Sequence, residues 1–209
     1  MKILLADDHA MMRSGLKLLL AEAFKDTTFG EADDCRKALQ MALAEPWDLI
    51  ILDISMPGRG GLDVLKEIHS QHPKTPVLMI SMYAEHQFAL RAFRAGAVGY
   101  LTKASAGAEL IRAVQHILTG GRYVSAQLAE QLATMLSNTG GTKLHERLSA
   151  REFEILRLIA SEKSIKEIAM ELSLSANTIS TYRIRILEKM QMHTNAELTQ
   201  YAMRHQLVE

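Results

Sequence analysis

LIILDISMPGRGG, residues 49–61, is the stretch that decides the fold of the first part of the chain. Four apolar residues run without alternation into one carboxylate, Asp53, and Pro57 and three glycines follow within eight residues. An unbroken apolar run is typical of a strand that is buried on both faces, and a cluster of Pro and Gly ends it. The stretch therefore predicts a buried strand with an acidic residue at its carboxyl end.

Similar runs recur on both sides of this strand. KILLA (2–6), PVLMIS (76–81) and VGYLT (98–102) are of the same kind, and TFGEA (28–32) is a weaker candidate. Segments with helical periodicity separate them, so strand and helix alternate five times over roughly the first 120 residues. This pattern indicates an α/β fold with a doubly wound, five-stranded parallel sheet, which is flavodoxin-like if the strand order is 2-1-3-4-5.

The last 60 or so residues contain no run that resembles a strand. Three pairs of a hydroxyl residue and a glutamate three positions later predict capping boxes that begin helices: Ser149 with Glu152, Ser164 with Glu167, and Thr194 with Glu197. Ser175 is a further candidate cap. We expect an α/β domain over residues 1–122, a linker over 123–145 with a helix at 126–137, and an all-helical domain over 146–209.

Polar side chains stand at the ends of four of the expected strands: Asp7 and Asp8, Asp53, Ser81, and Lys103. In a doubly wound sheet the carboxyl ends of neighbouring strands converge where ligands bind. Asp7 and Asp8, Ser81 or Lys103 alone would be explained by an ordinary solvated strand end, whereas Asp53 is a stronger candidate by itself because it directly follows a buried run. The joint placement of all five is improbable by chance. Crowded carboxylates need a cation, and ligand sets made only of oxygen favour Mg²⁺. A carboxylate in such a site can accept a phosphoryl group.

The segments LLADDH, LIILDISMPGRGGLDVL, VLMIS and GAVGYLTK resemble those of two-component receiver domains, over about residues 1–122. The resemblance implies that Asp53 accepts a phosphoryl group from a sensor histidine kinase. It also implies a Mg²⁺ site formed by Asp8, Asp53 and the Ser55 carbonyl, to which Asp7 contributes directly or through water. Lys103 would contact the phosphoryl group, and Ser81 and Tyr100 would form a switch pair in which the ring turns inward.

The segments SIKEIAMEL, SLS and ANTISTYRIRILEKM fit two helices joined by a tight turn. On the second helix a stripe of Ile179, Tyr182, Ile186 and Met190 is expected to face the core. The opposite side could contact double-stranded DNA through these residues: Asn177, Thr178, Ser180, Thr181, Arg183, Ile184, Arg185 and Lys189. From spacing alone, an ordinary helical hairpin with a solvated basic face fits equally well.

Residues 146–207 resemble the LuxR-type, or NarL/FixJ-type, DNA-binding domain. The resemblance implies a recognition helix at 176–190 in the major groove and a last helix that pairs two copies on DNA. The chain departs from the family pattern at five positions: Glu162, Ile165, Ser180, Tyr182 and Ile184. We therefore expect base contacts that differ from those of the family, modest phosphate affinity and a corresponding need for a homodimer.

Bulk composition names no partner, because 24 Lys and Arg balance 24 Asp and Glu. A single cysteine suits a reducing compartment, and no apolar run approaches the roughly 18 residues of a membrane span. A cytoplasmic protein without a membrane partner is expected.

The sequence thus predicts a response regulator transcription factor that uses Mg²⁺ and is not an enzyme beyond its own phosphorylation and dephosphorylation. Two alternatives stay open. The receiver could be only a dimerisation scaffold for a DNA-binding regulator that ignores phosphorylation. Less favoured is a phosphotransferase or phosphatase that uses Asp53 as its nucleophile.

Overall fold

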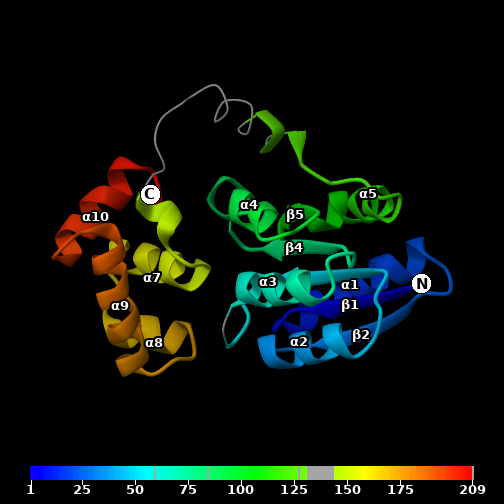
Figure 1. The fold of residues 1–209 in the computed structure, drawn as a ribbon, viewed down its shortest axis with the longest axis horizontal. Coiled ribbons are helices and arrows are strands. Elements are labelled where there is room, and N and C mark those ends of the chain that lie inside the picture. Colours follow the sequence, from blue (N-terminus) through cyan, green and yellow to red (C-terminus); the bar gives the residue numbers. More distant parts are fainter. Residues whose placement is uncertain (59, 84, 127, 131–143, 209) are drawn as a thin grey trace. The chain divides into compact units, whose positions relative to one another are not determined.

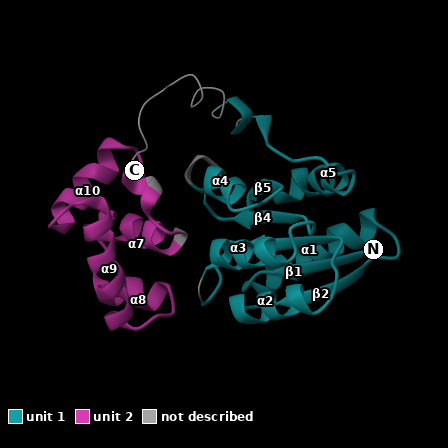
Figure 2. Cartoon of the chain, in the orientation of Figure 1, with its two compact units in different colours: residues 1–138 teal, residues 139–209 magenta. Residues whose placement is uncertain are grey.

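The computed structural model describes residues 1–58, 60–83, 85–126, 128–130 and 144–208. The chain forms two compact units, residues 1–138 and 139–209, which Figure 2 distinguishes by colour. The division falls outside the described residues, as do the Gly-rich linker and most of the helix expected at 126–137. The predicted domain bounds at 122 and 146 therefore stay predictions, and each unit is considered by itself.

The first unit is built on a five-stranded parallel sheet in the order β2-β1-β3-β4-β5 (Figure 1). Its strands are β1 (Lys2–Ala6), β2 (Thr28–Ala32), β3 (Leu49–Asp53), β4 (Val77–Ser81) and β5 (Gly99–Thr102). The predicted fold class and strand order are confirmed. The three central strands β1, β3 and β4 are buried almost throughout, as their unbroken apolar runs require.

Helices cover both faces of this sheet. They are α1 (Ala10–Ala23), α2 (Cys35–Ala44), α3 (Gly61–Gln71), α4 (Glu85–Arg94) and α5 (Ala106–Leu118). Alternate strand residues point to opposite faces, and Ile3, Ile51 and Leu101 join one core cluster with residues of α1 and α5. On the opposite face α3 contacts both α2 and α4. The first unit is therefore a three-layer sandwich of helices, sheet and helices.

The second unit is helical, and no strand occurs among its described residues. Its elements are the 3₁₀ turn η1 (Leu144–Arg147) and the helices α7 (Ala150–Ala160), α8 (Ile165–Glu171), α9 (Ala176–Met190) and α10 (Asn195–Arg204). α7 contacts both α9 and α10, and α8 contacts α9. The core stripe predicted for α9 is confirmed for Ile179, Ile186 and Met190, whereas Tyr182 is only half-buried.

Two of the three predicted capping boxes are present in full, at Ser149 with Glu152 and at Ser164 with Glu167. The third prediction was half wrong. Thr194 does accept the Glu197 backbone N–H, but the Glu197 carboxylate accepts from the backbone N–H of His193, at 2.7 Å, instead of that of Thr194. Ser175 caps α9 by accepting the Thr178 N–H, as predicted.

None of the helices in the described residues is long and apolar enough to cross a lipid bilayer.

Candidate functional site

The sheet register brings the polar strand ends of the first unit to one edge. Three neighbouring pairs fix the alignment: Ala6 with Leu52, Asp53 with Ile80, and Ser81 with Thr102. Asp7 and Lys103 each follow one residue after the last paired residue of their own strands. Because the strands are parallel, these carboxyl ends meet at the same edge, where doubly wound folds bind their ligands.

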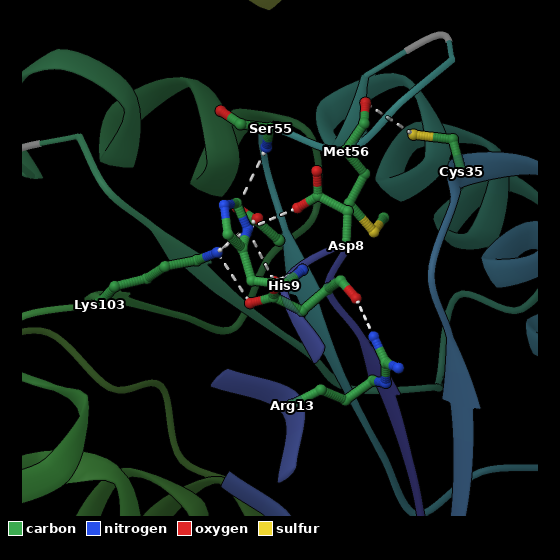
Figure 3. Close-up of polar contacts among 9 residues, drawn as sticks. Asp8, His9, Arg13, Cys35, Ser55, Met56 and Lys103 are labelled. Carbon is green, nitrogen blue, oxygen red and sulfur yellow. Dashed lines mark hydrogen bonds and ion pairs between the residues drawn. The ribbon is translucent and has the colours of Figure 1, made fainter. Parts of the chain in front are cut away.

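The Lys103 ammonium lies between two buried carboxylates. Its Nζ is 2.8 Å from Asp53 Oδ2 and 2.8 Å from Asp7 Oδ2. The Lys103 side chain is only 7% exposed, and Figure 3 shows its ammonium beside His9. Lys103 thus contacts two residues that lie far from it in the chain, Asp53 at a separation of 50 positions and Asp7 at a separation of 96.

Burial and charge shift the pKa values of this pair. Burial raises the pKa of the Asp53 carboxyl above its usual value, and neighbouring Asp7 adds to the rise, while Lys103 opposes it. Burial alone would lower the pKa of Lys103, but the charges of Asp53 and Asp7 outweigh it and raise that pKa. The lysine therefore keeps its positive charge, while burial and neighbouring Asp7 disfavour a negative charge on Asp53.

Four side chains of this edge could hold a metal ion. Asp7, Asp8, His9 and Asp53 each offer one ligand atom, and these atoms all lie within 4.8 Å of one another. His9 Nδ1 lies 2.7 Å from Asp8 Oδ1, which holds the imidazole against that carboxylate. Three carboxylates against one ammonium leave an excess of negative charge, and oxygen ligands favour a hard divalent cation. The residues present therefore fit such an ion.

The loop after β3 is shaped around Asp53. The Ser55 N–H donates to Asp53 Oδ1 at 3.1 Å, and the Gly61 N–H donates to the Ile54 carbonyl at 2.8 Å. A Cβ at position 61 would lie 2.0 Å from the Asp53 carbonyl oxygen, so only glycine allows α3 to start this close to the strand. The Ser55 carbonyl as a metal ligand stays a prediction.

Two supporting residues were missed by the sequence reasoning. Arg13 donates from Nη1 to the Asp7 carbonyl at 2.6 Å (Figure 3). It also donates from Nε to Glu31 at 3.0 Å. Cys35 holds the same loop from the side, because its N–H donates to the Pro57 carbonyl at 3.1 Å. The only available signal was their position in the first turns of α1 and α2, at the carboxyl edge of the sheet.

Ser81 and Tyr100, the predicted switch pair, both bind the backbone of Tyr83. Ser81 Oγ accepts the Tyr83 N–H at 3.1 Å, and the Tyr100 hydroxyl donates to the Tyr83 carbonyl at 3.0 Å. Both side chains are fully buried, so the Tyr100 ring already lies inward in this structure. The two residues are connected through one backbone segment, which is the link that a coupled movement would need; the movement itself stays a prediction.

In the second unit the predicted DNA-contacting residues divide by exposure. Asn177, Thr181, Ile184 and Arg185 are exposed on α9, while Thr178, Ser180 and Arg183 are half-buried. Lys189 is exposed but already paired, since its Nζ lies 2.8 and 2.6 Å from the two carboxylate oxygens of Glu152.

Arg183 is also engaged within the chain, because its Nε donates to Asn195 Oδ1 at 2.6 Å. These two cations therefore stabilise the packing of α9 against α7 and the start of α10. Their predicted contacts with DNA stay predictions.

Two family models match the chain. The response regulator receiver domain matches residues 3–115, and the luxR family of bacterial regulatory proteins matches residues 146–202.

Curated relatives match the chain over nearly its whole length. Response regulator GacA of Pseudomonas syringae pv. syringae (strain B728a) is 34% identical over 209 residues, which cover 100% of this chain and 98% of GacA. Response regulator UvrY of Escherichia coli (strain K12) is 32% identical over 208 residues, which cover 98% of this chain and 94% of UvrY.

Solved structures show the same architecture. A LuxR-family two-component response regulator from Aurantimonas sp. SI85-9A1 has 33% identity and a TM-score of 0.60, covering 66% of this chain and 98% of that chain. RcsB from Salmonella enterica serovar Typhimurium, solved on promoter P1flhDC with the phosphomimetic BeF₃⁻, has 24% identity, a TM-score of 0.60 and coverage of 96% and 97%. The RcsB likeness shows the fold. Together with the sheet order and the helical second unit, the matches establish that this chain belongs to the response regulators, as a transcription regulator with a receiver domain and a luxR-family DNA-binding domain.

Proposed function

We propose that Asp53 accepts a phosphoryl group from a sensor histidine kinase with the help of Mg²⁺, and that this changes dimerisation and sequence-specific binding to double-stranded DNA. The observation that carries the proposal is the placement of Asp53. Its carboxylate is 1% exposed and lies 2.8 Å from a buried ammonium, in a cluster with Asp7 and Asp8. A purely structural acid would not need such a costly surrounding of like charges.

The residues of the cluster have separate tasks in this proposal. A carboxylate oxygen of Asp53 attacks the phosphorus of a phosphorylated kinase histidine; an O–P bond forms, the N–P bond breaks and its electron pair returns to the imidazole. Lys103 holds its positive charge beside that oxygen and stabilises the transferring group, to which the Ser81 hydroxyl would also donate. Mg²⁺, held by Asp7, Asp8, Asp53 and the Ser55 carbonyl, would offset the developing negative charge.

The second unit supplies the DNA-binding part of the proposal. α9 is capped by Ser175 and anchored on α7 through Lys189 and Glu152, so it can present a rigid outer face to the major groove. The proposed contacts are the predicted set: Asn177, Thr178, Ser180, Thr181, Arg183, Ile184, Arg185 and Lys189. Since few of these are free cations, α10 pairing two copies into a homodimer would add the affinity that one copy lacks.

Phosphorylation can control DNA binding only if the phosphorylated and free forms differ in their free energy of dimerisation or of DNA contact. Ser81 and Tyr100 offer a route, because both bind Tyr83, which precedes α4 on the surface of the unit.

Mapping of the modified residue tests the first step. The full chain is incubated with acetyl phosphate and Mg²⁺, its intact mass is measured, and the label is located by peptide mapping after reduction with borohydride. We expect one phosphoryl group on Asp53, none in Asp53→Asn, and full labelling in Asp63→Asn, which removes an exposed acid of α3. A label on another residue would overturn the proposal, and steady turnover of a generic phosphate ester would favour the phosphatase alternative.

A further inference from the structure

The outer face of α9 carries one apolar residue among polar ones. Thr181 lies four residues after Asn177, Ile184 and Arg185 lie three and four residues after Thr181, and all four are exposed. Ile184 is 54% exposed, in the middle of this face. A single exposed apolar side chain is common on protein surfaces and carries no inference by itself. Its neighbours on the same face supply the second observation.

The hydroxyl groups beside Ile184 are turned back onto the helix. Thr181 Oγ1 donates to the Asn177 carbonyl at 3.0 Å, and Ser180 Oγ donates to the Ala176 carbonyl at 2.9 Å. A hydroxyl that is used in this way has given its one proton to the backbone. The aliphatic groups that remain at this part of the face are the Thr181 methyl group and the Ile184 side chain, three residues apart on the helix.

The two ends of the face are different, because they carry free donors. The side chains of Asn177 and Arg185 make no hydrogen bond or ion pair within the described part of the chain. An amide side chain can pair with adenine and a guanidinium with guanine in the major groove, whereas an apolar side chain contacts the C5-methyl group of thymine. The face thus combines two hydrogen-bonding ends with an apolar centre.

Resting on the proposed binding of α9 to DNA, we propose that Ile184, together with the Thr181 methyl group, is a specificity-determining contact that recognises a thymine C5-methyl group in each half-site. The chemistry is contact between aliphatic carbons and a methyl group that projects into the major groove. A lysine or arginine at this position would instead add phosphate affinity without reading this methyl group.

Removing the thymine methyl group from the DNA tests this contact without disturbing the protein. Duplexes are first selected from random DNA with the full chain, Mg²⁺ and beryllofluoride. In the recovered site each thymine is then replaced by uracil, which lacks only the C5-methyl group, and affinities are measured by fluorescence anisotropy at fixed salt. The proteins are the wild type, Ile184→Ala and the control Met170→Ala, which truncates an exposed apolar residue of α8.

For one thymine per half-site we expect uracil to weaken wild-type binding by about fourfold, and by roughly 15-fold when both half-sites are changed, as the burial of one methyl group implies. Met170→Ala should show the same sensitivity, and Ile184→Ala should show a clearly smaller one at that position, because only the Thr181 methyl group remains. The inference would be overturned if uracil replacement did not change wild-type affinity, or if it weakened Ile184→Ala by the same factor. A selected site without an invariant thymine would overturn it as well. Failure of the full chain to select any duplex over random DNA would overturn the proposed DNA binding as well, and is a separate result.

Discussion

At the scale of single residues, Asp53 is placed at a cost to stability. Its side chain is buried beside Asp7, and one ammonium serves both carboxylates. A buried charge that is only partly compensated destabilises the folded state, and a cation that binds the folded state alone stabilises it. The free energy of unfolding should therefore report directly on this cluster.

We expect Asp53→Asn to raise the free energy of unfolding in EDTA, because the amide removes a desolvated charge while Lys103 keeps Asp7 as its partner. Added Mg²⁺ should stabilise the wild type more than Asp53→Asn. Thermal unfolding followed by circular dichroism measures both effects, with Asp33→Asn on the exposed surface as the control. This account would be contradicted if Asp53→Asn were less stable than the wild type in EDTA and if Mg²⁺ stabilised both proteins equally.

Gly61 offers a second test of the same loop. In Gly61→Ala the new Cβ would meet the Asp53 carbonyl, so we expect a loss of about 1–3 kcal/mol of stability, and slower phosphorylation because Asp53 is displaced. Gly15→Ala is the matched control. Nothing lies within 4 Å of that Cβ in the interior of α1, and alanine there should stabilise by roughly 0.5–1 kcal/mol. Urea unfolding compares the two, and equal changes in stability would count against the close approach.

The sequence was sufficient to identify the polar strand ends, because an acid or a lysine directly after a buried run stands out. It could not identify Arg13 or Cys35 as supports of the cluster. Their roles depend on how far the first turns of α1 and α2 extend over the edge of the sheet, and that geometry is set by packing and not by local pattern.

At the scale of elements, Glu152 connects two helices of the second unit. It completes the capping box of α7 and also binds Lys189 of α9. Burial raises the pKa of its carboxyl, but hydrogen bonds from Lys189 and from Ser149 outweigh that effect, and the pKa lies below its usual value of 4.5. One carboxylate thus stabilises both the first turn of α7 and the packing of α9, the proposed recognition helix, against α7.

The lowered pKa of Glu152 determines how its contribution to the free energy of unfolding changes with pH. The stabilisation by Glu152 is fully present above about pH 4.5 and is lost as the pH falls through the lowered pKa of the folded state. At neutral pH, Glu152→Gln should cost about 1–3 kcal/mol and should weaken DNA binding, and the difference from the wild type should shrink in acid. Glu167→Gln, at the equivalent position of an exposed capping box, should change stability less. Equal losses in both variants would show that the Lys189 pair adds nothing.

Strand positions were predictable from the sequence almost to the residue, because unbroken apolar runs leave few alternatives. The detail of the third helix cap was not. Ser149 and Ser164 have φ values of −64° and −69°, whereas Thr194 has −132°. Where the φ of the cap residue differs in this way, Glu197 accepts from the N–H of His193. The S/T-x-x-E spacing alone does not determine that backbone angle.

At the scale of the whole molecule, the chain consists of two compact units, each with its own core. We expect differential scanning calorimetry of the full chain to resolve two transitions. Asp53→Asn should move only the transition of residues 1–138, and Glu152→Gln only that of residues 139–209. A single transition that moves as a whole in both variants would contradict this independence.

The sequence predicted that there are two units and what each resembles, since each has its own periodicity. It could not predict how a phosphoryl group in one changes the other. That coupling is a difference in free energy between two states of the molecule, and neither residue pattern nor local geometry contains it.

The most direct test of the central claim is to measure DNA affinity and association state together on the full chain, with and without beryllofluoride and Mg²⁺. Fluorescence anisotropy on a selected duplex and sedimentation velocity supply the two quantities. We expect beryllofluoride to raise DNA affinity by about 5- to 150-fold and to shift the monomer–dimer equilibrium in the wild type, with no response in Asp53→Asn. Unchanged affinity and association in the wild type, or the same response in Asp53→Asn, would contradict the account.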